Sequence, residues 1–157
     1  MSGTPRHLLI VAHAPSANTR RLREAVVRGA TSPEISGVGV KMLPPLEATP
    51  EDVLAAQAII LGTTENLGYM SGALKDFFDR CYYPVLEFKQ GLPYAAFIRA
   101  KLDGTGTRRA IESITTGLRW RAVQAPLILH GEFREDFIGQ CEALGTAMAA
   151  GLESGIF

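Results

Sequence analysis

A glycine-rich segment between an apolar run and an amphipathic pattern constrains the fold of this chain more than any other stretch. The apolar run, residues 58–61, is typical of a buried strand, and residues 62–72 (GTTENLGYMSG) read as a loop of small and hydroxylated residues with three glycines. Apolar residues then recur at helical spacing over residues 71–80. A buried strand that leads through such a loop into a helix is a common way to hold a flat, anionic cofactor at the edge of a parallel sheet.

A second unit of the same kind stands near the amino terminus. Residues 7–12 have a strand pattern, residues 13–19 (HAPSANT) form a polar loop, and residues 18–29 carry apolar residues at helical spacing. Two strand–loop–helix units in a chain of 157 residues predict a nucleotide or flavin site.

Strands and helices alternate along the remaining chain. Near-continuous apolar strands between amphipathic helices predict an α/β fold, a three-layer sandwich around a five-stranded parallel sheet of order 2-1-3-4-5. The loops after strands one, three and four then meet at the switch point of the sheet, and the length fits a single domain, residues 1–157. The further strands are expected at residues 38–43, 57–61, 94–98 and 123–129, the last interrupted by Pro126. The further helices are expected from Thr49, over residues 108–118 and over residues 135–150. Residues 82–88 are expected to be irregular.

Charge and composition disfavour several classes of function. The chain has 16 basic and 16 acidic residues, so its balanced charge does not favour binding to nucleic acid or to an acidic membrane. No apolar run reaches the ~20 residues of a membrane span, and the first residues lack a signal-peptide core, so a cytoplasmic protein is expected. Cys81 and Cys141 lie far apart and are expected to be reduced packing residues. The three scattered histidines predict no metal site.

Three segments resemble those of a known superfamily. Residues 16–19 (SANT) match a phosphate-loop pattern, residues 62–80 match a second flavin loop with the helix that follows it, and residues 103–106 (DGTG) stand where a third loop runs past the ring. By these motifs the whole chain resembles the flavodoxin-like superfamily and looks closest to its NAD(P)H-dependent FMN and quinone reductase branch. The resemblance implies FMN as cofactor and NADH or NADPH as electron donor.

The expected cofactor-binding residues come from these three loops. Amides and hydroxyls at the start of the first helix suit a phosphate dianion, although the other reading is that Ser16 or Asn18 only caps that helix. Gly68 and Gly72 would let the backbone approach the flavin ring and donate hydrogen bonds to its polar edge. The full set is His13, Ser16, Asn18 and Thr19 from the first loop, Thr63, Thr64, Glu65, Asn66, Leu67, Gly68 and Tyr69 from the second, and Asp103 and Gly104 from the third.

The chain departs from the family pattern at a few positions. Thr64 stands where the family often has proline, Leu67 where it often has an aromatic residue, and Ala17 where glycine is frequent. Lys101 precedes the third loop in place of a small residue. It is either a solvated cation or a contact for a nicotinamide phosphate or an acidic substrate.

The favoured hypothesis is an FMN-binding oxidoreductase that takes hydride from NADH or NADPH and passes electrons to a small-molecule acceptor, such as a quinone or free flavin. No catalytic side chain is expected because the flavin carries the chemistry, and the resemblance implies a homodimer or tetramer. Two alternatives stay open. Balanced charge disfavours a flavodoxin-type electron carrier, since such carriers dock through acidic surfaces. The departures at Thr64, Leu67 and Lys101 keep open a flavodoxin-fold binding module without flavin.

Overall fold

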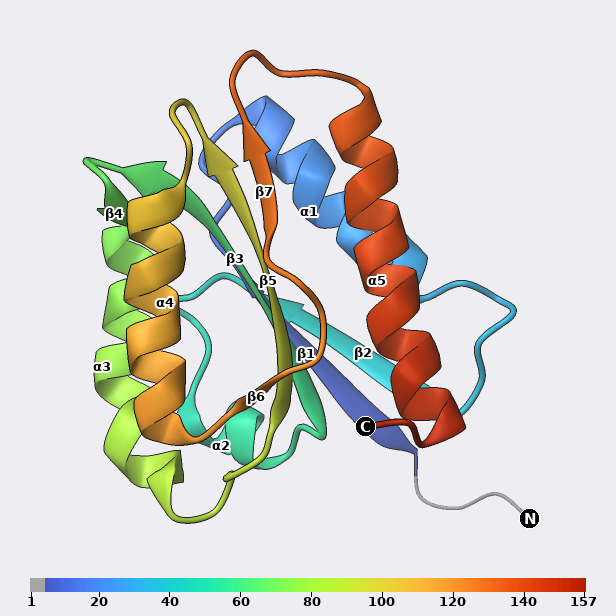
Figure 1. The fold of residues 1–157 in the computed structure, drawn as a ribbon. Helices are drawn as coiled ribbons and strands as arrows, with labels where there is room; N and C mark the ends of the chain where they lie inside the picture. The colour runs from blue at the N-terminus through green and yellow to red at the C-terminus, as the bar shows by residue number, and fades with distance from the viewer. Residues whose placement is uncertain (1–4) are drawn as a thin grey trace.

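The computed structural model describes residues 5–157 as a twisted sheet between two layers of helices (Figure 1). The strands are β1 (Arg6–Ala12), β2 (Val38–Leu43), β3 (Ala58–Asn66), β4 (Tyr69–Met70), β5 (Pro93–Ala100), β6 (Arg121–Ala122) and β7 (Leu127–His130). The helices are α1 (Ala17–Ala30), α2 (Pro50–Leu54), α3 (Gly72–Leu86), α4 (Thr105–Leu118) and α5 (Asp136–Ser154).

The sheet is parallel along its main path β2-β1-β3-β5, and β6 and β7 both pair in parallel with the outer edge of β5. Since β6 and β7 together take the place of the predicted fifth strand, the predicted order 2-1-3-4-5 is confirmed. The fifth strand is broken between Ala122 and Leu127. Pro126 lies in this break, where it has no N–H to donate to the ladder.

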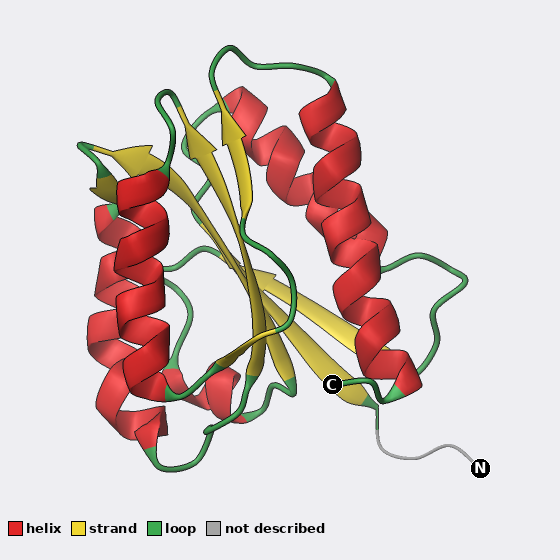
Figure 2. Cartoon of the chain, viewed as in Figure 1, coloured by secondary structure: helices red, strands yellow, loops and turns green. Residues whose placement is uncertain are grey.

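Helices cover both faces of the sheet (Figure 2). Leu8 and Ile10 of β1 are buried in the core beneath α1 and α5, whereas Leu9 and Val11 are buried in the core beneath α2, α3 and α4. Successive side chains of a strand point to opposite faces, so a strand covered on both faces is apolar at nearly every position. This packing accounts for the near-continuous apolar runs in the sequence.

The expected loop after the third strand is partly wrong, because β3 continues to Asn66. Leu67 and Gly68 then form a two-residue turn, and β4 returns antiparallel with Asn66 opposite Tyr69. Both turn residues have positive φ, 53° and 75°. Two positive φ values are characteristic of the hairpin turn whose twist matches that of its strands. The segment therefore forms a β-hairpin.

The expectation that residues 82–88 are irregular is wrong for residues 82–86. α3 runs through Pro84 and ends at Leu86. Proline inside a helix removes a hydrogen bond at a cost of about 3 kcal/mol. However, Cys81 and Val85 on the same helix are 2% and 0% exposed. We attribute the helical last turn to burial of this apolar face, which outweighs the lost bond. α4 also begins earlier than expected, at Thr105 rather than near residue 108.

Two further observations concern the two cysteines and membrane insertion. Cys81 and Cys141 are both buried and free, as expected of packing residues. Among the helices of residues 5–157, none is long and apolar enough to cross a bilayer.

Candidate functional site

A cavity of about 690 Å³ lies at the carboxyl edge of the sheet. Its volume falls in the range of pockets that hold small molecules or cofactors. The edge is at the top of Figure 1, where the loops after β1, β3, β5 and β7 come together. The lining residues are Ser16, Asn18 and Thr19 from the start of α1, Thr64 and Glu65 from β3, Arg99, Ala100, Lys101 and Leu102 from β5 and its loop, and Gly131, Glu132 and Phe133 from the loop after β7.

The start of α1 lines this cavity through Ser16, Asn18 and Thr19. Ser16 caps the helix: its hydroxyl accepts a hydrogen bond from the Thr19 amide at 3.1 Å, and the Thr19 hydroxyl accepts one from the Ser16 amide at 2.9 Å. Ser16 therefore caps the helix and also lines the cavity, and its expected contact with the phosphate stays a prediction. Capping leaves the amides of Ala17 and Asn18 without an acceptor among residues 5–157. Free amides at a helix start, together with the positive end of the helix dipole, suit an anion.

His13 lies beside the cavity and not among its lining residues. Its amide donates to the Gly62 carbonyl oxygen at 2.9 Å, which joins the loop after β1 to β3. Partial burial lowers the pKa of its imidazole below the usual 6.5, because burial disfavours the charged form. Burial therefore favours the neutral form of His13.

Thr63 points away from the cavity and into a buried hydrogen-bond network. Its hydroxyl donates to the Thr64 carbonyl oxygen at 2.9 Å and accepts from the Ser71 amide at 3.0 Å. The Ser71 hydroxyl, 3.1 Å away, in turn accepts from the Leu74 amide at the start of α3. Thr63 thus ties β3 to α3, whereas its neighbours Thr64 and Glu65 line the cavity.

The hairpin residues Asn66, Leu67, Gly68 and Tyr69 do not line the cavity; the turn is docked on α4. The Thr107 hydroxyl donates to the Tyr69 carbonyl oxygen at 3.0 Å. A β carbon at Gly106 would lie 2.1 Å from the Gly68 carbonyl oxygen, so only glycine permits this approach. The cofactor contact expected of these four residues stays a prediction.

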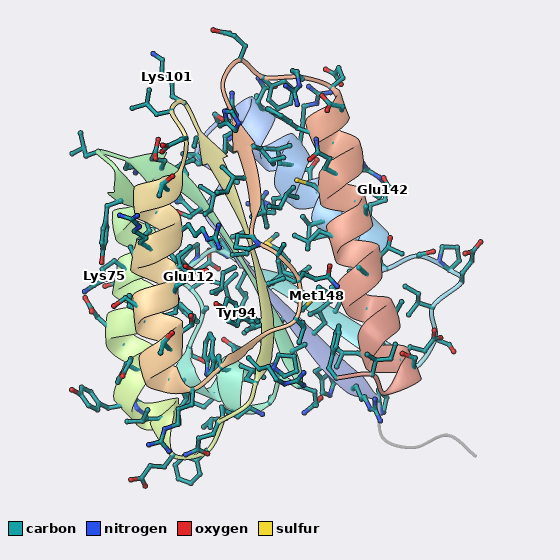
Figure 3. The ribbon with its side chains drawn as sticks, in the orientation of Figure 1. Lys75, Tyr94, Lys101, Glu112, Glu142 and Met148 are labelled. Carbon is teal, nitrogen blue, oxygen red and sulfur yellow. The ribbon has the colours of Figure 1, made fainter. Side chains whose placement is uncertain are left out.

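Asp103 and Gly104 shape the third loop without lining the cavity. The Asp103 carboxylate accepts from the Thr105 amide at 3.0 Å, and this hydrogen bond holds its pKa below the usual value. Gly104 has a φ of 72°, and a β carbon there would lie 2.8 Å from the Ile128 side chain. Lys101, in contrast, projects from the tip of the same loop, beyond the edge of the sheet (Figure 3).

The expected set lacks several residues of the cavity wall, above all Arg99 and Phe133. Arg99 is a charged residue at the end of the apolar fourth-strand pattern, and this is the sequence signal that could have identified it. Phe133 carries no comparable signal, because it stands in a loop between charged residues. Within residues 5–157, no group of three or more His, Cys, Asp or Glu side chains could hold a metal ion.

Solved structures share this arrangement of strands and helices. The chain superposes on a flavodoxin from the domain Archaea with a TM-score of 0.78, covering 93% of this chain and 98% of that one at 20% identity. The chain has the flavodoxin-like fold. A flavodoxin, WrbA-like protein from Agrobacterium tumefaciens superposes with a TM-score of 0.72 at 20% identity, covering 92% of this chain and 96% of that one.

A sequence relative supports the same fold. A flavodoxin from Aquifex aeolicus (strain VF5) is 33% identical over 111 residues, which are 71% of this chain and 59% of that protein. The chain matches no family model. In flavodoxin-like sheets the strand order reverses between β1 and β3, and ligands bind at the carboxyl ends of the strands beside that point. The cavity lies at this edge.

Proposed function

We propose that the chain is an FMN-binding redox protein that takes electrons from NADH or NADPH and passes them to a small-molecule acceptor such as a quinone or free flavin. One observation carries the proposal. The cavity at the carboxyl edge is lined by the start of α1, where two amides have no acceptor within residues 5–157, and by the ends of β3 and β5. Flavodoxin-like sheets hold their ligands at this edge.

The residues at this edge fit the cofactor in chemistry and size. The amides of Ala17 and Asn18 would receive the phosphate, because they have no acceptor within residues 5–157 and stand at the positive end of the α1 dipole. Leu102 and Phe133 supply apolar surface to the same cavity, as a flat ring requires. Bound FMN would supply hydride and electron transfer, so the chain itself needs to bind, orient and shield it.

A second candidate, an electron carrier, has an observation in its favour. The Aquifex aeolicus relative is named a flavodoxin, although this chain spans only 59% of its length. Balanced charge argues against the carrier, because 16 basic and 16 acidic residues produce no acidic field to steer a partner. We therefore favour the reductase.

Absorbance spectra of the purified protein test the proposal, with and without added FMN and then with NADPH under anaerobic conditions. We expect flavin bands at about 450 nm that bleach on addition of NADPH. Bands that bleach only with a separate reductase would favour the carrier. Failure to bind FMN at micromolar concentration would exclude both redox functions.

The variant A17P tests the phosphate contact without removing the helix. Proline fits the first position of a helix and removes the N–H proposed to bind phosphate. Ser16 before it is already extended, with φ −129° and ψ 167°, as a residue before proline requires. Loss of one charged hydrogen bond should weaken FMN binding by about ten- to hundredfold. Riboflavin, which lacks the phosphate, is the matched control and should bind A17P and wild type equally.

A further inference from the structure

Arg99 is held rigidly at the wall of the cavity. It stands near the end of β5, opposite Thr64 of β3 and Leu129 of β7. Its Nη1 donates to the Ala100 carbonyl oxygen at 2.8 Å and to the Leu129 carbonyl oxygen at 3.0 Å. Both hydrogens of this nitrogen are thereby used, so the plane of the guanidinium is fixed relative to the sheet.

The other edge of the guanidinium is free. Nε and Nη2 donate to no acceptor within residues 5–157, and neither is sealed from solvent. These two nitrogens form the fork with which arginine binds carboxylate or phosphate through two parallel hydrogen bonds. Nη1 alone is enough to join β5 to β7, so Nε and Nη2 remain available to bind another group.

Two aromatic rings flank the group. The Arg99 Cζ lies 5.9 Å from the Phe133 ring centroid and 5.3 Å from that of Phe137. Cations within about 6 Å of a ring face are attracted to it. The two rings meet edge to face at 5.7 Å. The rings therefore hold the guanidinium in place without neutralising its charge.

The neighbouring guanidinium groups are paired with carboxylates, whereas that of Arg99 is not. Arg21 also lies over Phe133 and pairs with Glu135 at 2.6 Å; Arg134 lies over Phe137 and pairs with Asp136 at 2.9 Å. No carboxylate within the described residues pairs with Arg99. Glu132 also lines the cavity, and its charge acts on Arg99 from beyond ion-pair distance.

We propose that Arg99 is an oxyanion-binding residue, whose Nε and Nη2 bind a phosphoryl or carboxylate group of the molecule in the cavity. This inference deepens the proposed function and rests on it for the identity of that molecule. The oxyanion comes either from FMN itself or from the second substrate. Lys101, exposed on the next loop, adds positive charge at the mouth of the same cavity.

Titration of the flavin-free protein with inorganic phosphate tests the subsite directly. The readout is the Nε–H signal of Arg99 in a ¹H–¹⁵N NMR spectrum, assigned by its absence in R99K. We expect this signal to shift saturably, and R99Q to bind phosphate about ten- to hundredfold more weakly. R134Q is the matched control, because it removes a guanidinium from the same Phe137 ring outside the cavity lining. Its phosphate affinity should equal that of wild type.

Binding measurements then identify the source of the oxyanion. If R99Q weakens FMN but not riboflavin, Arg99 binds the cofactor phosphate. If R99Q leaves FMN binding unchanged and weakens NADPH more than NADH, which lacks one phosphate, Arg99 binds the second substrate.

Two results would overturn the inference. One is an Arg99 Nε–H signal in wild-type protein that phosphate does not move, a test that requires no variant to fold. The other is equal weakening of FMN and riboflavin by R99Q with no change in phosphate binding, as a purely structural residue would cause. Phosphate binding without FMN binding would refute the proposed function and leave the subsite standing.

Discussion

The Cα of Gly106, in the first turn of α4, packs directly on the carbonyl oxygen of Gly68 at the tip of the β3–β4 hairpin. An added β carbon would come within 2.1 Å of that oxygen. Beside this contact, the Thr107 hydroxyl donates to the Tyr69 carbonyl oxygen at 3.0 Å. The second and third loops of the carboxyl edge are thus joined by backbone contact, and the position of the hairpin depends on a glycine in another element.

The substitution G106A should destabilise the protein by about 1–3 kcal/mol, because the clash is with backbone and moves the hairpin. Urea denaturation measures the change. G139A is the matched control: Gly139 is also helical, and a β carbon there meets nothing within 4 Å. It should stabilise the protein by about 0.5–1 kcal/mol. Equal effects of the two variants would show that the hairpin is not docked on α4.

Adjacent threonines of β3 should respond differently to loss of the hydroxyl. T63V leaves the buried Ser71 amide without its acceptor, and we expect a loss of about 1–3 kcal/mol in the free energy of unfolding. T64V removes only a partly exposed contact with the Asn66 side chain and should change stability by less than about 0.5 kcal/mol. Chemical denaturation of both variants measures the difference, and a larger loss in T64V would contradict the network described here.

Leu67 occupies an unfavourable backbone conformation with no compensating contact. Its φ is 53°, and the residue is fully exposed. L67N creates the Asn-Gly pair preferred in such turns and should raise the free energy of unfolding by about 0.5–1 kcal/mol. If Leu67 is kept because it contacts flavin, the same variant should bind FMN more weakly. Thermal unfolding and FMN titration measure the two effects, and a destabilised L67N would contradict the turn geometry.

Buried Cys141 should make the protein sensitive to alkaline pH. Burial raises the pKa of this thiol from its ordinary 9.0 to about 12. Its contribution to stability is therefore complete below pH 9 and is lost as the pH rises toward 12, because only the unfolded chain ionises there. C141A should be less stable than wild type at neutral pH. Above pH 9, its free energy of unfolding should fall with pH less steeply than that of wild type, by up to ~1.4 kcal/mol per pH unit. Parallel pH profiles of wild type and C141A would contradict this assignment.

The layered fold could be predicted because the spacing of apolar residues along each strand and helix indicates which of its faces are buried. β1 is apolar at consecutive positions, and both of its faces are buried. The cap of α1 was also predictable, since Ser16 and Thr19 form a local pattern with a direct physical meaning. Errors arose where contacts between distant residues override local preference. α3 passes through Pro84 because Val85 is buried against the sheet.

The candidate site, too, could be predicted only in part from the sequence. The sequence by itself determined which loops meet at the carboxyl edge, because the strand order places the ends of those strands together. Five of the residues predicted from the sequence line the cavity: Ser16, Asn18, Thr19, Thr64 and Glu65. Only the tertiary structure decided that the hairpin packs on α4 and that Arg99 is clamped between β7 and two phenylalanines. These contacts join residues thirty or more positions apart, and neither local periodicity nor a short motif indicates which side chains will meet.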